Sequence, residues 1–170
     1  LLLNKDIDKL IICRPSIPAD EGRGSVDLGA LPGDVFQKMS LLGLPQINLF
    51  ERILGAERFE RYLEEKKIEF LPPAYLRGYS MYRSLAIVDE CQNMSVTIAK
   101  LMATRIGWDS KIIFAGDLSQ TDFKDQESGL KYLLKSLDNL DGVGIVRLDG
   151  SDIVRHPLIP KMIERFNKYQ

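Results

Sequence analysis

The sequence predicts an α/β fold in which helices cover both faces of a mostly parallel sheet. Short apolar runs rich in β-branched residues alternate with longer segments of helical period, which is typical of strand–helix–strand crossover units. Two of the runs, LAIV within residues 85–89 and IIFA within residues 111–116, contain no polar residue. Strands of that kind are covered on both faces, so we expect these two at the centre of the sheet.

Length and composition indicate one ordinary globular domain spanning residues 1–170. The chain is 45% hydrophobic and 28% charged, which excludes global disorder, collagen and a coiled coil. Its 23 basic and 24 acidic side chains leave no broad positive surface, so any contact with nucleic acid needs a local patch. Cys13 and Cys91 lie in apolar runs, and no apolar run reaches the ~18 residues of a membrane span. We therefore expect a cytoplasmic protein without disulfides or membrane contact.

Local patterns place the elements in order along the chain. The five expected strands occupy residues 9–14, 68–71, 85–89, 111–116 and 143–148. Residues 15–34 are rich in proline, glycine and charge, which predicts a long loop. Residues 47–67 repeat an aromatic-then-aliphatic triplet on either side of Gly55, which predicts one helix or two short ones.

Three further helices are expected to pack in the core or on the sheet. Ser95 can cap the first, whose apolar stripe runs over residues 98–106 and which closes at Gly107. The second carries four leucines between residues 130 and 137. The third begins at Pro157, because proline suits the first turn of a helix.

Two carboxylates, Asp89 and Glu90, follow directly after one of the apolar strands. Burial of two unpaired charges is costly, so both side chains should emerge at the carboxyl end of the strand, where open α/β sheets bind ligands. Such a pair can serve phosphoryl chemistry, with Asp89 holding Mg²⁺ and Glu90 orienting and deprotonating the attacking water. For an isolated pair, two solvated acids at the end of a strand are an equal alternative.

The next apolar strand ends in a second polar group, Gly116, Asp117 and Gln120. Gly116 allows close backbone approach, Asp117 adds a carboxylate, and the Gln120 amide can bond a terminal phosphate and a water. Because parallel strands present their carboxyl ends to one crevice, we expect this group to converge with Asp89 and Glu90. Taken alone, the segment GDLSQ is typical of a turn.

Several motifs in order resemble the PhoH family, which comprises phosphate-starvation-associated ATPases similar to the motor core of superfamily-one RNA and DNA helicases. The matching runs are IICRPSIP, LGALPGDVFQKM, YLRGYSMYRSLAIVDECQNMS, ATRIGWDSKIIFAGDLSQTD and SDIVRHPLI. The resemblance spans about residues 9–166. It implies a RecA-like P-loop fold and Mg²⁺-dependent ATP hydrolysis coupled to nucleic acid, RNA ahead of DNA, in ring-forming homo-oligomers.

The resemblance also assigns roles to residues. DECQN matches the helicase DExx box, which makes Asp89 the metal-binding residue and Glu90 the catalytic base. GDLSQ matches the motif that senses the γ-phosphate, so Gly116, Asp117 and Gln120 are candidates for nucleotide contact, with Gln120 as the sensor.

Four arginines complete the candidate residues. IICRPS resembles the helicase motif that touches the nucleic-acid backbone, so Arg14 is a candidate for phosphate contact, with a structural salt bridge as an equal alternative. Arg155, which precedes a helix, is a candidate finger that stabilises charge on the transferred phosphoryl group, in cis or across a subunit boundary. Arg77 and Arg105 are candidates for phosphate or interface contacts.

The sequence departs from the family at the phosphate-binding loop. A P-loop requires G-x-x-x-x-G-K-[ST], and the chain contains neither this string nor any Gly-Lys pair. We expect the loop and its strand upstream of Leu1, which makes the chain a fragment that binds ATP poorly. That strand would lie beside the one ending at Gly116, so we also expect marginal stability for the isolated chain. A degenerate homologue without the loop is the alternative.

The sequence is therefore compatible with three classes of function. The leading hypothesis is the nucleic-acid-coupled ATPase. The second is a metal-dependent nuclease that uses Asp89, Glu90 and Asp117 as a carboxylate cluster, which needs no P-loop. The third is a non-catalytic scaffold with a decayed ATPase fold.

Overall fold

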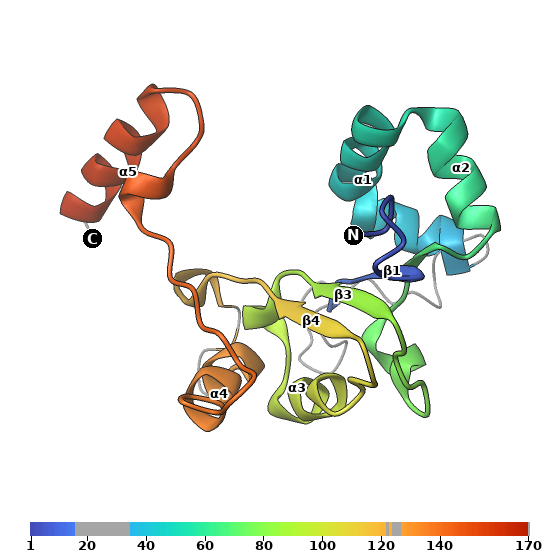
Figure 1. Cartoon of the computed structure of the whole chain (residues 1–170). Helices are drawn as coiled ribbons and strands as arrows, with labels where there is room; N and C mark the ends of the chain where they lie inside the picture. The colour runs from blue at the N-terminus through green and yellow to red at the C-terminus, as the bar shows by residue number, and fades with distance from the viewer. Residues whose placement is uncertain (16–34, 122, 124–126, 170) are drawn as a thin grey trace. The chain divides into compact units, whose positions relative to one another are not determined.

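A four-stranded sheet, parallel throughout, forms the centre of the computed structural model, which describes residues 1–15, 35–121, 123 and 127–169. The strand order is β2-β1-β3-β4 (Figure 1). The strands are β1 (Lys9–Cys13), β2 (Ile68–Phe70), β3 (Ser84–Val88) and β4 (Lys111–Phe114). Four of the five expected strands are thus confirmed to within two residues at each end. The expected loop at residues 15–34 lies, apart from Pro15, outside the described residues.

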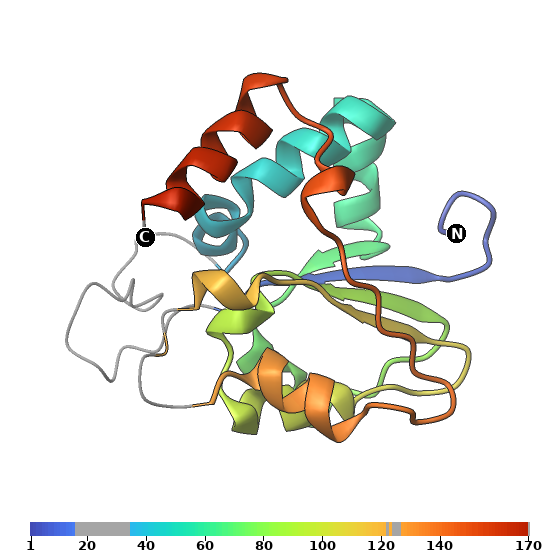
Figure 2. The same ribbon diagram turned by 90° about the vertical axis from the view of Figure 1, so that its left-hand side faces the viewer.

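Helices cover both faces of this sheet. Figures 1 and 2 show α1 and α2 on one face and α3 and α4 on the other. The α-helices are α1 (Val35–Leu54), α2 (Ala56–Glu64), α3 (Val96–Ala103), α4 (Gly129–Ser136) and α5 (Leu158–Lys168). Single 3₁₀ turns are η2 (Pro73–Leu76), η3 (Cys91–Asn93), η4 (Leu118–Gln120) and η5 (Gly150–Asp152). Within the described part of the chain, no helix combines the length and the apolar character needed to cross a bilayer.

Gly55 divides the helical segment in two. Its φ of +81° lies in the left-handed region that glycine adopts without steric cost, so α1 ends before it and α2 begins after it. Phe50 of α1 stacks on Phe59 of α2, with ring centroids 5.8 Å apart. Of the two alternatives, one helix or two short ones, the structure has two helices, of which α2 is short and α1 is a 20-residue helix that begins at Val35 rather than at residue 47.

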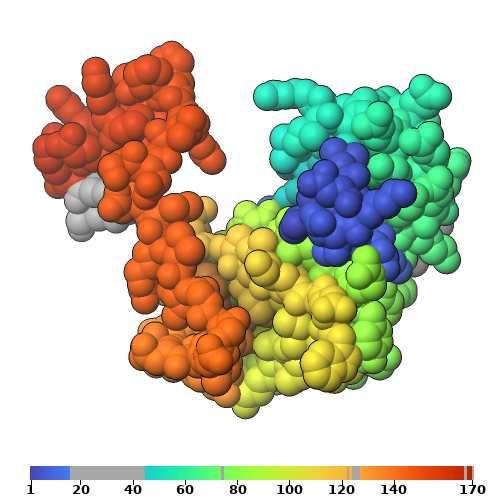
Figure 3. All heavy atoms as spheres, in the orientation of Figure 1, coloured from blue at the N-terminus to red at the C-terminus, as the bar shows by residue number. Residues whose placement is uncertain are grey.

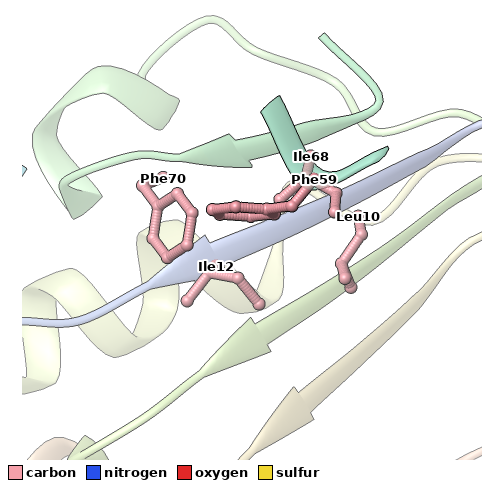
Figure 4. Packing of buried hydrophobic residues seen from close by; sticks show 5 residues of the cluster. All are labelled: Leu10, Ile12, Phe59, Ile68 and Phe70. Carbon is pink, nitrogen blue, oxygen red and sulfur yellow. The ribbon is translucent and has the colours of Figure 1, made fainter. Parts of the chain in front are cut away.

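An aromatic and aliphatic cluster joins α1 and α2 to the sheet. Its buried members, shown in Figure 4, are Leu10, Ile12, Phe59, Ile68 and Phe70. Alternation along β1 directs Leu10 and Ile12 toward this cluster and Ile11 and Cys13 to the opposite face, where both are fully buried. β1 is therefore covered on both faces.

The helix after Ser95 begins as predicted and ends early. The Ser95 hydroxyl accepts a hydrogen bond from the backbone N–H of Ile98 at 3.3 Å, which satisfies one of the free donors of the first turn. α3 ends at Ala103, and the hydroxyl of Thr104 donates to the carbonyl of Lys100 at 2.9 Å. The prediction that the buried stripe continues to Ile106 is wrong, because that residue lies beyond the helix and is 53% exposed.

β4 is an edge strand of the described sheet. It pairs with β3 on one side, whereas β3 pairs with both β1 and β4. Ile113 of β4 is 42% exposed, and the yellow atoms of this region lie at the surface in Figure 3. The central position predicted for residues 111–116 is therefore wrong for this sheet, while that of residues 85–89 is confirmed. Coverage of a strand depends on its neighbours, which its own composition does not specify.

Residues 137–170 form a second compact unit, separate from residues 1–136. Residues 143–148 form no strand there, and Val146 and Leu148 are 83% and 77% exposed. The predicted fifth strand is thus wrong, because an apolar β-branched run becomes a strand only beside a hydrogen-bonding neighbour. The helix predicted from Pro157 is present as α5, and its apolar residue Phe166 is 60% exposed.

Candidate functional site

Asp89 and Glu90 lie at the carboxyl end of β3, as the sequence predicts. The backbone N–H of Asp89 donates to the carbonyl of Cys13 at 2.9 Å, which extends the pairing with β1 to this residue. Glu90 then adopts a left-handed backbone with φ +56° and ψ +38°. For a residue with a Cβ this conformation costs about 1 kcal/mol, so the contacts around Glu90 must fix the turn into η3.

The Asp89 carboxylate is held by two donors. Its Oδ1 accepts from the backbone N–H of Glu90 at 3.0 Å, and its Oδ2 accepts from Nε2 of Gln46 at 2.7 Å. Gln46 lies on α1, 43 residues earlier in the chain, and its Oε1 is buried without a partner among the described residues. Sequence analysis missed Gln46, because a single glutamine in an amphipathic helix carries no local signal of its partner.

The Glu90 carboxylate is held at both oxygens. Oε1 accepts from Nη2 of Arg14 at 3.3 Å, and Oε2 accepts from Nε2 of Gln92 at 2.7 Å. The side chains of Arg14 and Glu90 are 32% and 37% exposed, so their ion pair contributes at most about 1 kcal/mol of stability. The salt bridge proposed as one role of Arg14 is present, and it places a cation beside the candidate base.

Gln92 connects the two strand ends. Its side chain is 1% exposed, its Nε2 donates to Glu90, and its Oε1 accepts from the backbone N–H of Asp117 at 3.2 Å. Its main-chain carbonyl also accepts from the hydroxyl of Thr121 at 3.1 Å. The motif DECQN contains Gln92, yet the sequence assigned it no role. Its place shortly after the acid pair was the only signal in the sequence.

Gly116 lies against this glutamine. A Cβ at this position would come within 2.5 Å of Gln92 Oε1, 3.0 Å of Leu130 Cδ2 and 3.1 Å of the Cys91 nitrogen. Glycine at this position therefore allows the Gln92 side chain and the start of η3 to lie close to the backbone of residue 116.

The turn after β4 is held by its own side chains. Asp117 Oδ1 accepts from the Ser119 backbone N–H at 2.9 Å and from its hydroxyl at 2.7 Å, while Oδ2 accepts from Gln120 Nε2 at 2.7 Å. The hydrogen bonds from Ser119 lower the pKa of the Asp117 carboxyl below its ordinary value. Asp117 and Gln120 are exposed and bonded to each other, and Gln92 joins this turn to Glu90.

The carboxylate cluster of the nuclease hypothesis does not form. Among the described residues, which include Asp89, Glu90 and Asp117, no group of three acidic, cysteine or histidine side chains could hold a metal ion. The reason is that Asp117 turns its carboxylate back onto Ser119 and Gln120. The described structure therefore does not assemble the three-carboxylate cluster on which the nuclease hypothesis depends.

The acid pair fits one kind of metal site. Mg²⁺ bound to a nucleotide takes one or two protein carboxylates and completes its octahedron with phosphate oxygens and water. Asp89 and Glu90 supply two partly exposed carboxylates at the end of β3, which suits a phosphate-bound Mg²⁺ and is too few for an all-protein cage.

Of the other candidate arginines, Arg105 lies at the opposite edge of the sheet and Arg155 belongs to the second unit. The carbonyl of Arg105 accepts from the N–H of Met81 at 3.0 Å, which places Arg105 at the amino end of β3, the edge opposite the acids. Its Nε is buried without a partner among the described residues. Arg77 lies on an exposed turn after η2, and Arg155 is exposed between η5 and α5.

Comparison with known proteins identifies the family. A family model described as PhoH-like protein matches residues 1–167. The chain belongs to the PhoH family. It is 39% identical over 168 residues to a PhoH-like protein of Bacillus subtilis, which covers 98% of this chain and 51% of that protein. A PhoH-like protein of Synechocystis is 37% identical over 168 residues, again 98% of this chain and 50% of the relative.

Protein PhoH of Escherichia coli is 34% identical over 169 residues, which are 98% of this chain and 46% of that protein. This PhoH-family chain thus spans about half the length of the curated relatives it matches. Its parallel sheet between helical layers is the α/β, RecA-like fold that the sequence motifs predicted.

Proposed function

We propose that this PhoH-family chain carries the metal-binding acid, the catalytic base and the γ-phosphate sensor of an ATPase coupled to nucleic acid. The observation that supports it is the placement of Asp89 and Glu90 at the carboxyl end of β3, joined through Gln92 to the turn that bears Gln120. In open α/β sheets this edge is where ligands bind. The amides that cradle the phosphates would come from residues outside this chain.

Each side chain has one task in this proposal. Asp89 would hold Mg²⁺, and the ion, when bound, would supply charge neutralisation to the nucleotide phosphates. Glu90 orients the attacking water and accepts its proton, and its two oxygens retain lone pairs beyond those used by Arg14 and Gln92. Gln120 donates to the γ-phosphate once its amide leaves Asp117, and Gly116 keeps the backbone of that turn close to η3.

Glu90→Gln in the full-length protein tests the proposed base. Nucleotide binding should persist, while turnover should fall by about 10² to 10⁴ because the amide cannot accept the proton. Glu60→Gln on the exposed surface of α2 is the matched control and should hydrolyse ATP at the wild-type rate. Wild-type turnover in Glu90→Gln would end the assignment.

Arg14 supports a link between nucleic acid and hydrolysis. It lies at the end of β1 and contacts Glu90, so a phosphodiester that draws on its guanidinium changes the charge beside the base. We expect Arg14→Gln to weaken RNA binding and to reduce the slope of log affinity against log salt by about 0.7, the contribution of one phosphate contact to a single strand. An unchanged slope would restrict Arg14 to its ion pair with Glu90.

The cellular setting is part of the same proposal. Cys13 and Cys91 are free and buried, which supports a reducing compartment such as the cytoplasm.

We place the ATPase in a homo-oligomeric ring in which Arg155 reaches the nucleotide of a neighbouring subunit. Arg155→Ala should then regain activity when mixed with a Glu90→Gln partner that retains Arg155, and absence of rescue would favour action in cis or a structural role.

A further inference from the structure

Gln92 is a buried amide placed between two functional groups. At 1% exposure its polar atoms have lost their water, and burial of an amide is tolerated only when both halves are hydrogen-bonded. The NH₂ half meets the Glu90 carboxylate at 2.7 Å, and the carbonyl half meets the Asp117 N–H at 3.2 Å. The side chain therefore spans from the end of β3 to the end of β4.

Chemistry fixes the orientation of this amide. A carboxylate accepts only, and a backbone N–H donates only, so the NH₂ must face Glu90 and the carbonyl must face Asp117. A flipped amide would set oxygen against oxygen at one end and N–H against N–H at the other. Gln92 thus has one stable orientation, in which it bonds both strand ends.

The surrounding contacts hold the glutamine in place. The Cys91 N–H donates to the carbonyl of Ala115 at 2.9 Å, and the Thr121 hydroxyl donates to the Gln92 carbonyl at 3.1 Å. Gly116 leaves no room for a Cβ, which would lie 2.5 Å from Gln92 Oε1. The two strand ends are therefore packed tightly across this side chain.

We propose that Gln92 is a positioning residue that holds the candidate base Glu90 and the sensor turn of residues 117–120 in one register. The inference rests on the proposed ATPase function for its catalytic meaning. One rigid amide bonds both groups, so Gln92 fixes the Glu90 carboxylate and the Asp117 N–H relative to each other.

Hydrogen exchange of the Asp117 amide tests this link without reference to activity. In the full-length protein, Gln92→Met keeps the volume of the side chain and removes both bonds, so exchange at Asp117 should accelerate at least about tenfold. Glu90→Gln should also accelerate it, because the charged acceptor for the Gln92 NH₂ is lost. Ser128→Ala is the control, since this buried serine bonds to the Lys131 N–H and should leave Asp117 exchange unchanged. Unchanged exchange in both Gln92→Met and Glu90→Gln would overturn the proposal.

Kinetics add a second readout. Gln92→Met should lower kcat by about 10- to 100-fold, the usual loss for a partner that orients a catalytic group, with KM changed less than about threefold. Combined with Glu90→Gln it should cause little further loss, because Gln92 acts through Glu90. Additive losses, or a loss in KM alone, would contradict a positioning role.

Gln92→Glu separates the two halves of the bridge. It retains an acceptor for the Asp117 N–H and places a second carboxylate against Glu90. Hydrogen exchange at the Asp117 amide should stay slow while kcat falls. Fast exchange in this variant would contradict the proposal that the carbonyl half of Gln92 holds Asp117 and the NH₂ half holds Glu90. If Glu90→Gln hydrolyses ATP at the wild-type rate, the proposed ATPase function fails, whereas the exchange experiment still decides whether Gln92 joins the two strand ends.

Discussion

β3 and β4 have similar apolar sequences and different surroundings. β3 lies between β1 and β4, and its Ala86 and Val88 are fully buried. β4 has β3 on one side within the described sheet, and its Ile113 is 42% exposed. The difference shows that two apolar runs that both form strands can be buried to different extents, because neighbouring strands and helices determine how far each strand is covered.

The polar residues that follow β3 and β4 also differ, in how far away in the sequence their hydrogen-bond partners lie. After β3, Asp89 is bonded to Gln46, 43 residues away, and Glu90 to Arg14, 76 residues away. After β4, Asp117 bonds to Ser119 and Gln120 within its own turn. Contacts between distant segments therefore hold the acids, whereas the Asp117 side chain bonds within its own turn and only the Asp117 backbone N–H bonds to Gln92.

The largest difference is expected in thiol reactivity, between the two buried native cysteines and a cysteine placed in β4. Burial raises the pKa of Cys13 to about 12 and also raises that of Cys91. At pH 8 a thiol of pKa about 12 is thiolate in about 1 molecule in 10⁴, whereas an ordinary thiol of pKa ~8.5 is thiolate in about a quarter. A cysteine introduced at Ile113 should thus react with Ellman's reagent about a thousandfold faster than the native pair. Equal rates would show that β1 and η3 open as readily as β4.

The second-largest difference is expected in the free energy of unfolding when the same isoleucine-to-alanine substitution is made in β1 and in β4. Ile11→Ala in β1 removes a fully buried side chain and should lower the free energy of unfolding by about 2–5 kcal/mol. Ile113→Ala in β4 should cost less than about 1 kcal/mol because that side chain is already partly hydrated. Urea denaturation of both variants measures the difference. Equal losses would mean that β4 is covered in solution.

Gly116→Ala tests the junction between the strand ends. The new Cβ would overlap Gln92 Oε1, so the free energy of unfolding should fall by about 1–3 kcal/mol. Gly150→Ala is the control, since a Cβ there would meet no atom of the described residues within 4 Å and its φ is not left-handed. It should change stability by less than about 0.5 kcal/mol. Thermal unfolding measures both, and a neutral Gly116→Ala would show that Gln92 is free to move.

Asp117→Asn should give the smallest effect. The lowered pKa of Asp117 means that its ionised form stabilises the fold above the ordinary carboxyl range of about pH 3.9, and that this contribution is lost as pH falls through the lower folded pKa. Because the group is exposed, the contribution is below about 1 kcal/mol. The stability difference between wild type and Asp117→Asn should therefore shrink as the pH falls below about 3.9. A constant difference would contradict the sign of the shift.

Local patterns predicted much of the fold. Gly55 between two aromatic triplets, Ser95 before an apolar stripe, and apolar runs ending in acids each carry their meaning within a short stretch of sequence. The exposed Ile106, the edge position of β4 and the absent strand at 143–148 depend on neighbours that such patterns do not contain. Gln46 was missed because its hydrogen bond to Asp89 joins residues 43 apart in the sequence, and the role of Gln92 was missed because its second bond reaches Asp117 at the end of another strand.

A crystal structure of the full-length protein with Mg²⁺ and a non-hydrolysable ATP analogue would show whether the nucleotide binds at the carboxyl ends of β3 and β4. We predict that Asp89 reaches the metal directly or through one water, that Glu90 contacts the water facing the γ-phosphorus, and that Gln120 bonds a γ-phosphate oxygen with Gln92 still bridging Glu90 and Asp117. A nucleotide bound elsewhere, with Asp89 and Glu90 in contact with solvent alone, would contradict the account.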